Sequence, residues 1–285
     1  MRRSRLLVAV VIAAGALLSY YGSREVNPVT GETQHIAISK QQEVALGLRS
    51  APEMAEQFGG LEQDAEMQDD VEALGQNIVK KSGAAKTSYE FRFRVLKDPR
   101  TVNAFALPGG PVFITRALLD RLQNEAQLAG VLGHEIGHVV GRHSAEHLSK
   151  SQLAQGLVGA IGVATSDDQG GQGGAQLAAV VAQLIQLRYG RNDELEADTL
   201  GVTFMSEAGY DPRVLIEVMN ILEKSSGGGG RRPEFLSTHP DPGNRRERIQ
   251  EAIDRRYPNG VPPELTAGRE IKLTTGAGGS AATAQ

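Results

Sequence analysis

The pentapeptide His134-Glu135-Ile136-Gly137-His138 constrains this chain more than any other feature. On an α-helix each residue advances by about 100°, so positions four apart lie about 40° apart on one face. His134 and His138 therefore project together and can bind one metal ion, as the H-E-x-x-H spacing requires. Glu135 lies about 100° round the helix, where it could accept a proton from a water that the metal activates. The motif predicts a helix that carries two metal ligands and a base.

The absence of cysteine narrows the kind of metal site that this chain can build. It excludes Cys-ligated zinc, a disulfide framework, a cysteine nucleophile and a lipidated N-terminal cysteine. A zinc ion would have to be held by histidines and carboxylates, which is typical of catalytic rather than structural sites. The 285 residues, 40% of them hydrophobic and 22% charged, indicate one sizeable globular domain with appendages. The formal charge of −4 gives no reason to expect nucleic acid as a partner.

Residues 1–22 have the pattern of a targeting segment. Arg2, Arg3 and Arg5 form a basic start, and an uncharged apolar run follows from Leu6 to Tyr21. This pattern is typical of a secretory signal peptide, although no clear small-x-small cleavage site follows the run. An uncleaved signal anchor, which would attach the chain to a membrane, is therefore an open alternative. The apolar run is slightly short for a relaxed membrane span, which needs about 20 residues. In either case we expect export, to the periplasm or to the extracytoplasmic face of a membrane.

Periodicity and turn residues divide the remainder of the chain. Residues 23–38 are predicted to be an extended linker, residues 39–257 the domain, and residues 258–285 a disordered tail. Within the domain, apolar alternation and turn residues predict strands near residues 89–95, 103–107 and 112–115. Helical spacing and capping residues predict helices at 43–48, 64–81, 117–122, 193–208, 211–226 and 242–256. The predicted fold class is α+β, mostly helical, with a small β-sheet.

The helix that carries the pentapeptide is predicted to begin near Asn124, an N-cap residue with Gln127 three positions later. It is predicted to continue past Leu148. Two apolar stretches, 153–164 and 175–187, flank a Gly-rich break and predict a helical hairpin. Both stretches are short for a membrane span, so packing against the domain is favoured over a place in a membrane.

A catalytic zinc usually takes three protein ligands, so the pentapeptide needs a partner. In the pattern H-E-x-x-H-x-x-G-x-x-H, a glycine turns the chain and a third histidine reaches back. Gly141 occupies the glycine position here, but the histidine, His143, comes one residue early. If the helix continues, His143 lies about 180° and His147 about 220° from His134, and both point away from the metal. We therefore predict that His143 and His147 are surface or packing residues.

A later helix offers the alternative ligand. Glu194 and Asp198 are four residues apart and share a face, whereas Glu196 lies about 200° from Glu194 and cannot join them. One carboxylate can bind the metal while the other orients a liganding histidine through its free ring N–H. An acidic helix is more often a solvated face, but here the pentapeptide requires a carboxylate from outside its own helix.

Four separate motifs follow one another along the chain as they do in the HtpX-like zinc metallopeptidases, and the chain resembles that family. The family includes the type I CAAX prenyl proteases and bacterial envelope quality-control proteases. The segment 103–110 (N-A-F-A-L-P-G-G) is similar to the strand before the family's metal helix, and the segment 237–240 (S-T-H-P) is similar to its late histidine-proline loop. The resemblance covers about residues 60–255. The other matching positions, besides the pentapeptide, are Glu194, Ala197, Asp198, Arg245 and Arg248.

The resemblance implies a gluzincin-like metallopeptidase domain that binds one Zn²⁺ per chain. It implies that His134, His138 and Glu194 bind the metal and that Glu135 is the catalytic base, with Asp198 supporting a ligand. The substrates are then polypeptides, and we expect unfolded or misassembled envelope proteins. Multi-span members of the family carry several long membrane helices, and this sequence has none beyond its N-terminus. It is therefore more similar to the soluble, periplasm-type members, and a prenylated substrate is not expected.

His239 is the candidate donor to the oxyanion of the transition state, with Arg245 behind it. His239 could instead occupy the open position of the zinc and hold the enzyme latent, or simply pack beside Pro240. The strand at 103–107 or the strand at 112–115 could offer an edge to which an extended substrate adds. An envelope chaperone or assembly factor with a regulatory zinc site is the alternative function that the sequence leaves open.

Overall fold

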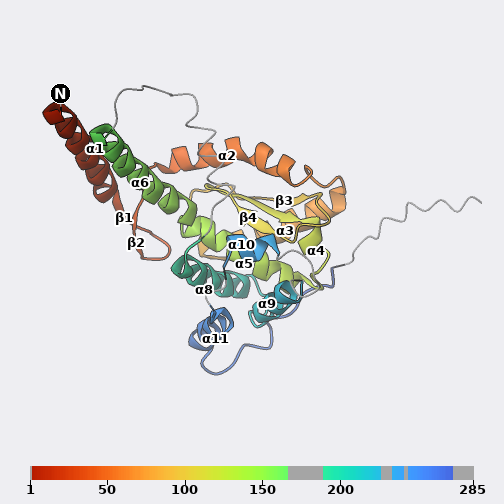
Figure 1. Ribbon diagram of the computed structural model, residues 1–285. Coiled ribbons are helices and arrows are strands. Elements are labelled where there is room, and N and C mark those ends of the chain that lie inside the picture. The colour runs from red at the N-terminus through yellow and green to blue at the C-terminus, as the bar shows by residue number, and fades with distance from the viewer. Residues whose placement is uncertain (1, 166–188, 226–232, 241–242, 272–285) are drawn as a thin grey trace, which may run out of the picture.

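The computed structural model describes residues 2–165, 189–225, 233–240 and 243–271. Figure 1 shows a small sheet between helical layers, with α2 over one face, α3 and α5 against the other, and α8, α9 and α11 beyond α5. The predicted α+β, mostly helical class is confirmed. The larger helices are α1 (Arg2–Gly22), α2 (Lys40–Gln57), α3 (Ala65–Lys81), α5 (Glu125–Val140), α6 (His143–Thr165), α8 (Arg191–Glu207), α9 (Val214–Lys224) and α11 (Arg245–Arg256). The shorter ones are η1 (Gly83–Lys86), α4 (Arg116–Leu119) and α10 (Glu234–Thr238).

The main sheet has the order β3-β5-β4, with β3 parallel and β4 antiparallel to β5. Period-two alternation sends Phe93 and Val95 to the large core under the sheet, while Leu96 joins the smaller cluster beneath α2. The turn from β4 to β5 contains Gly109 and Gly110, whose φ angles of +79° and +127° favour glycine. The strand order places β4 at an edge of the sheet. The strands are β3 (Arg92–Leu96), β4 (Ala104–Ala106) and β5 (Pro111–Thr115).

The helix α5 forms the centre of the domain, and every residue from Ala126 to Val140 is buried. Its N-cap is Asn124, as predicted, and the Asn124 side chain accepts a hydrogen bond from the Gln127 backbone N–H. A capping box of Ser39 and Gln42 is present at the start of α2. Such caps each stabilise a helix by about 1 kcal/mol. The Asn124 cap therefore placed the start of α5 correctly, whereas α2 begins three residues before the predicted 43 and continues to Gln57.

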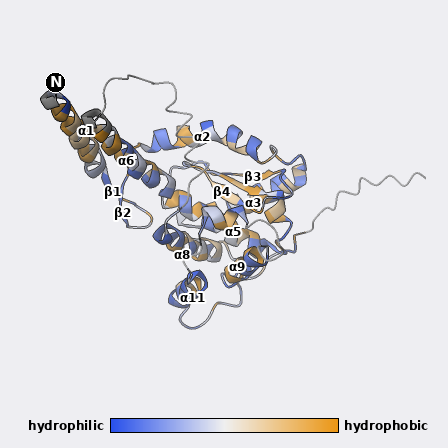
Figure 2. Cartoon of the chain, in the orientation of Figure 1, coloured by the Kyte–Doolittle hydropathy of each residue, from blue (hydrophilic) through white to orange (hydrophobic). Residues whose placement is uncertain are grey.

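The helix α1 lies beside α6, away from the sheet (Figure 1). Large apolar side chains of α1, among them Leu7, Val11 and Leu18, are exposed. The same apolar character is visible along both helices in Figure 2. Within the part of the chain that the structure describes, Ser4–Gly22 is the one helix whose length and hydropathy fit a membrane span.

The segment 23–38, predicted to be an extended linker, contains an antiparallel hairpin of β1 (Arg24–Val26) and β2 (Thr33–His35). The hairpin reaches the end of α5: the Asn27 side chain donates to the Val140 carbonyl at 2.7 Å, and the Gln34 side chain donates to the Gly141 carbonyl. The prediction was wrong because strands of three residues are too short to show alternation. Their place is fixed by contacts with residues more than a hundred positions away.

Two further expectations require correction. The helix of the pentapeptide does not continue past Leu148: α5 ends at Val140, and α6 begins at His143 in a new direction. The predicted disordered tail is ordered as far as Ile271, and the carbonyls of Ala267 and Arg269 accept hydrogen bonds from the first backbone N–H groups of α5. The apolar hairpin is described only over its first half, in α6, which packs on α1; 175–187 lies outside the described residues.

Candidate metal centre

The two histidines of the pentapeptide face the same point, as the helical spacing predicts. The Nε2 atoms of His134 and His138 lie 3.0 Å apart, and both side chains are 1% exposed. Glu135 is fully buried beside them, and neither of its carboxylate oxygens has a hydrogen-bond partner among the described residues. Burial raises the pKa of the Glu135 carboxyl. A buried carboxylate without a donor, next to converging imidazoles, is an arrangement suited to accepting a proton.

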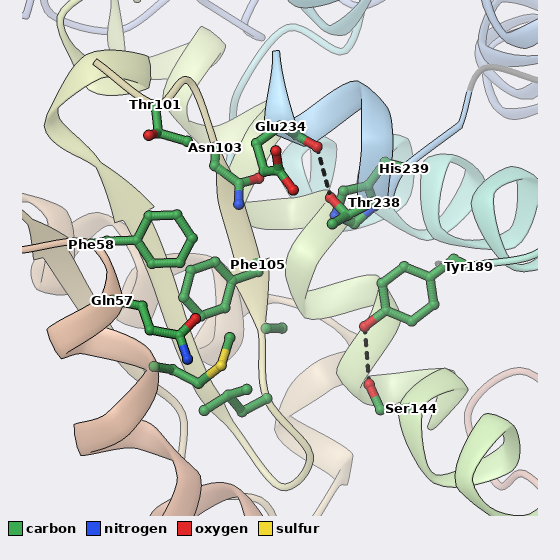
Figure 3. A pocket seen from close by; sticks show the side chains of 13 residues that line it. Gln57, Phe58, Thr101, Asn103, Phe105, Ser144, Tyr189, Glu234, Thr238 and His239 are labelled. Atoms are coloured by element: carbon green, nitrogen blue, oxygen red, sulfur yellow. Dashed lines mark hydrogen bonds between the residues drawn. The ribbon is translucent and has the colours of Figure 1, made fainter. Parts of the chain in front are cut away.

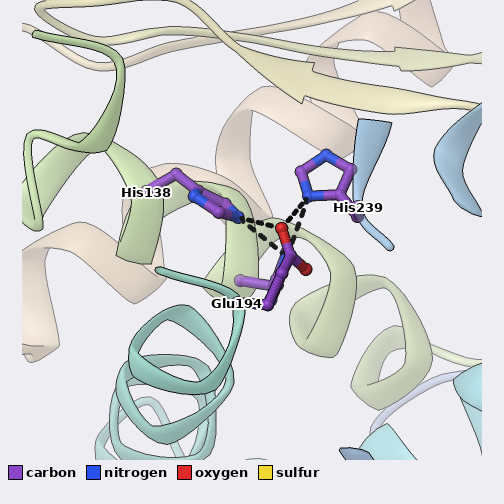
Figure 4. A group of neighbouring side chains, drawn as sticks. His138, Glu194 and His239 are labelled. Atoms are coloured by element: carbon purple, nitrogen blue, oxygen red, sulfur yellow. Dashed lines mark hydrogen bonds and ion pairs between the residues drawn. The ribbon is translucent and has the colours of Figure 1, made fainter. Parts of the chain in front are cut away.

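Helix α8 packs closely on α5 because small residues line the contact. A Cβ atom added at Gly137 would lie 3.0 Å from the Ala197 carbonyl oxygen, and one added at Gly133 would lie 3.3 Å from that of Gly201. This close approach brings Glu194 into the cluster, with its two oxygens each 3.5 Å from a histidine Nε2. Figure 4 shows the Glu194 carboxylate beside the ring of His138.

The outer nitrogen of His134 is held by a buried carboxylate. Its Nδ1 lies 2.9 Å from Asp198, which in turn accepts hydrogen bonds from Arg245 at 2.7 and 2.9 Å. A third guanidinium nitrogen of Arg245 lies 3.2 Å from Glu194. Burial alone would raise the pKa of the Asp198 carboxyl, but the Arg245 charge outweighs it and lowers that pKa. His239 and Arg245 likewise hold the pKa of the Glu194 carboxyl below its usual range, against the effect of burial.

His239 enters the same cluster from the end of α10, beside Glu194 (Figure 4). Its Nδ1 lies 3.0 Å from Glu194 and 3.3 Å from His134 Nε2, and its Nε2 lies 3.6 Å from Glu135. The Phe235 ring stacks on the His239 ring at 4.4 Å between centroids. His239 is thus placed among the donor atoms, whereas Arg245 contacts the carboxylates.

The donor set fits a zinc ion. One ligand atom from each of His134, His138, Glu194 and His239 lies within 4.8 Å of the other three. Imidazole nitrogens and carboxylate oxygens are ligands that Zn²⁺ takes in proteins. With Nδ1 of His134 facing a carboxylate, the tautomer assigned from this partner leaves Nε2 without a proton. The lone pairs of the buried imidazole nitrogens then face the Glu194 carboxylate, and a cation bound between these atoms would give each of them a partner.

A pocket of about 250 Å³ adjoins His239. Figure 3 shows Phe58 and Phe105 on one side of it, and His239 and Tyr189 on the other. The edge strand β4 contributes to its wall. Because Leu107 N–H donates to Pro111 and Thr115 N–H donates to Asn103, alternation leaves the backbone groups of Ala104 and Ala106 facing away from β5. The strand at 112–115 is central in the sheet and has no such edge.

The structure brings every predicted site residue into one buried cluster. The sequence interpretation missed three neighbours of His138. Tyr189 stacks on its ring at 3.8 Å between centroids, and His143 and Glu196 form a hydrogen-bonded series behind it. In the sequence, Gly141 was the one indication of these contacts. It marked a turn after the pentapeptide, whereas the prediction assumed that the helix continues. The clustered residues are His134, Glu135, His138, Glu194, Asp198, His239 and Arg245.

Fold and site together define a class: peptidases whose buried H-E-x-x-H helix is completed by a glutamate from a second helix. The model of peptidase family M48 matches residues 65–253, which is more than half of the chain. The chain belongs to that family, and the resemblance inferred from its motifs is confirmed.

Relatives with curated names agree with this membership. The beta-barrel assembly-enhancing protease of Yersinia pestis is 30% identical over 248 residues, which cover 85% of this chain and 50% of that protein. Its namesake in Escherichia coli strain K12 is 34% identical over 61% of this chain and 36% of that protein. The mitochondrial metalloendopeptidase OMA1 of Schizosaccharomyces pombe is 34% identical over 61% of this chain and 49% of that protein. The matched region thus spans half or less of each of these proteins.

Proposed function

We propose that this chain is a zinc-dependent endopeptidase that hydrolyses peptide bonds in unfolded or misassembled envelope proteins. One observation carries the proposal: His134, His138 and Glu194 converge from two helices on one point, with the buried Glu135 beside it. Membership of a peptidase family supports the same reaction class.

In this proposal His134, His138 and Glu194 hold the metal. A zinc ion bound there lowers the pKa of water and polarises the scissile carbonyl. Glu135 accepts the proton of the attacking water and passes it to the leaving amine nitrogen. Its burial supports this role, since a raised pKa brings a carboxylate nearer to the range in which a base works at neutral pH.

The position of His239 supports the latent alternative over the role of oxyanion donor. Its Nδ1 lies among the donor atoms, at hydrogen-bond distance from Glu194, and its other nitrogen faces Glu135. If His239 served as a fourth donor to the metal, it would have to move before a substrate carbonyl could enter. Arg245 is engaged with Asp198 and Glu194, so its proposed role is to hold these carboxylates.

The edge of β4 and the pocket beside it support binding of an extended polypeptide. An added strand would pair with the outward backbone groups of Ala104 and Ala106, while one side chain enters the pocket that lies between Phe105 and His239. Such pairing recognises the substrate backbone more than its side chains, so it suits unfolded substrates of varied sequence. Relatives named for beta-barrel assembly and the apolar helix α1 support an envelope location, with α1 as a signal or anchor.

The alternative is an envelope chaperone or assembly factor with a regulatory zinc site, and the relatives' name "assembly-enhancing" is the observation that favours it. Casein cleavage by the purified chain, with and without a chelator, separates the two. The proposal expects cleavage that the chelator stops and added zinc restores. Binding of unfolded protein without cleavage, in a zinc-loaded sample, would support the alternative.

A further inference from the structure

The outer nitrogen of His138 contacts a second histidine. His138 Nδ1 lies 2.9 Å from His143 Nδ1, and His143 Nε2 lies 3.2 Å from a carboxylate oxygen of Glu196. His143 is 1% exposed, and the Glu196 side chain is 25% exposed. A series of three side chains therefore connects the buried cluster with the rim of the domain, on the side of His138 opposite to Glu194.

His143 reaches His138 only because the chain turns sharply. On a continuous helix, positions five apart lie roughly 140° apart, so His143 would face away. The turn is made at Arg142, a non-glycine residue with φ of 56°. Arg142 is held there by Glu43, at 2.9 and 3.0 Å, and by an ion pair with Glu25. These contacts stabilise the turn, because a non-glycine residue keeps a left-handed backbone conformation only where its surroundings favour it.

Hydrogen-bond chemistry gives the series one direction. An ionised carboxylate only accepts, so Glu196 takes the proton of His143 Nε2. With the single ring proton of His143 assigned to Nε2 from this partner, its Nδ1 is an acceptor and His138 Nδ1 is the donor to it. This order leaves His138 Nε2 with a lone pair directed at Glu194 and His134. The tautomer that binds a metal through Nε2 is therefore the one that the series selects.

We propose that His143 and Glu196 are positioning residues for His138. They fix the tautomer and the ring orientation of His138, as Asp198 does for His134. The proposal rests on the metal site proposed above. Its consequence is that loss of either residue weakens zinc binding although neither contributes a donor atom to the cluster. Outer partners of metal-bound histidines typically contribute about 10–100-fold to metal affinity.

The test is the zinc affinity of purified variants, measured by competition with a chromophoric chelator. His143→Phe keeps a ring of similar size but removes the acceptor, and we expect a loss of about 10–100-fold. Glu196→Gln should give a smaller loss. His143→Gln should recover part of the affinity, because its amide oxygen can accept from His138 and its NH₂ can donate to Glu196.

A matched control lies one helical turn further along α6. His147 Nε2 lies 2.6 Å from Asp193, so His147→Phe breaks a similar histidine–carboxylate contact between α6 and α8 without touching His138. We expect His147→Phe to change zinc affinity by less than about threefold. Far-UV circular dichroism and thermal unfolding confirm that each variant is folded, and an unfolded His143→Phe leaves His143→Gln and Glu196→Gln to decide.

Equal zinc affinity in wild type, His143→Phe and Glu196→Gln would overturn the inference. So would equal losses in His143→Phe and His147→Phe, because they would indicate general disturbance of the contact between α6 and α8. A failure of the proposed function looks different: the wild-type chain itself would then bind no zinc, or would bind it without cleaving protein.

Discussion

His134 and His138 lie one turn apart on α5 and face the same point, yet their outer nitrogens are supported in different ways. Behind His134 lies Asp198, a charged side chain that is 2% exposed and clamped by the equally buried Arg245. Behind His138 lies His143, an imidazole ring that is itself supported by Glu196, whose side chain is 25% exposed. The first arrangement pairs opposite charges in the interior, and the second pairs two imidazole rings there.

The comparison predicts different consequences of damage on the two sides. Removing one charge from a buried pair leaves the other unpaired, which costs several kcal/mol of folding stability. Removing His143 leaves a buried ring nitrogen of His138 without a partner but leaves no unpaired charge, which costs about 1–3 kcal/mol. We therefore expect the His134 side to determine folding and metal binding together, and the His138 side to determine mainly metal binding.

Arg245→Met should have the largest effect on stability. It leaves the carboxylates of Asp198 and Glu194 without their cation in the interior, and we expect a loss of about 3–5 kcal/mol in the free energy of unfolding. Urea denaturation of zinc-saturated protein measures this loss. A loss below about 1 kcal/mol would show that the buried charges do not distinguish the two sides.

Asp198→Asn tests the same side more gently. The asparagine can still accept from His134 Nδ1, but it loses the charge that pairs with Arg245. We expect zinc affinity to fall by about 10–100-fold, at least as much as in Glu196→Gln. Chelator competition on both variants in parallel gives the ranking. A smaller loss in Asp198→Asn than in Glu196→Gln would reverse the comparison.

Gly137→Ala disturbs what the two sides share, the contact between α5 and α8. The new methyl group would lie 3.0 Å from the Ala197 carbonyl oxygen, so α8 has to shift. We expect a loss of about 1–3 kcal/mol in thermal unfolding. The control is Gly159→Ala on α6, where a Cβ meets nothing within 4 Å and helix propensity favours alanine. Equal stabilities of the two variants would contradict the close contact.

Arg248→Ala should have the smallest effect. Arg248 lies on α11 three residues after Arg245, but it is half-exposed and pairs with the equally exposed Glu251 at 2.8 Å. Exposed pairs of this kind contribute about 0–1 kcal/mol. We expect stability and zinc affinity close to those of wild type in the same urea and chelator assays. A large loss would mean that burial does not separate these two arginines.

Local periodicity predicted much of the site. Helical spacing alone placed His134 and His138 together, Glu135 beside them, and Glu194 and Asp198 on one face of a second helix. These arrangements depend only on residues within one turn of each other. The prediction that His143 packs rather than binds metal also agrees with its position, although the geometry behind that prediction was wrong.

The turn after α5 could not be predicted from local pattern. Arg142 adopts a left-handed conformation because Glu25 and Glu43 reach it from distant parts of the chain. The sequence around Arg142 does not indicate those partners. The hairpin of β1 and β2 and the ordered segment up to Ile271 were missed for the same reason, because both are fixed by hydrogen bonds to backbone that is remote in the sequence.

Glu135→Gln provides the most direct test of the account, because it separates metal binding from chemistry. The side chain keeps its size and does not belong to the donor set, so the variant should bind one zinc per chain with wild-type affinity. Casein cleavage should fall by at least about 100-fold, since the base that accepts the proton is gone. Cleavage at the wild-type rate by the zinc-loaded variant would contradict the account.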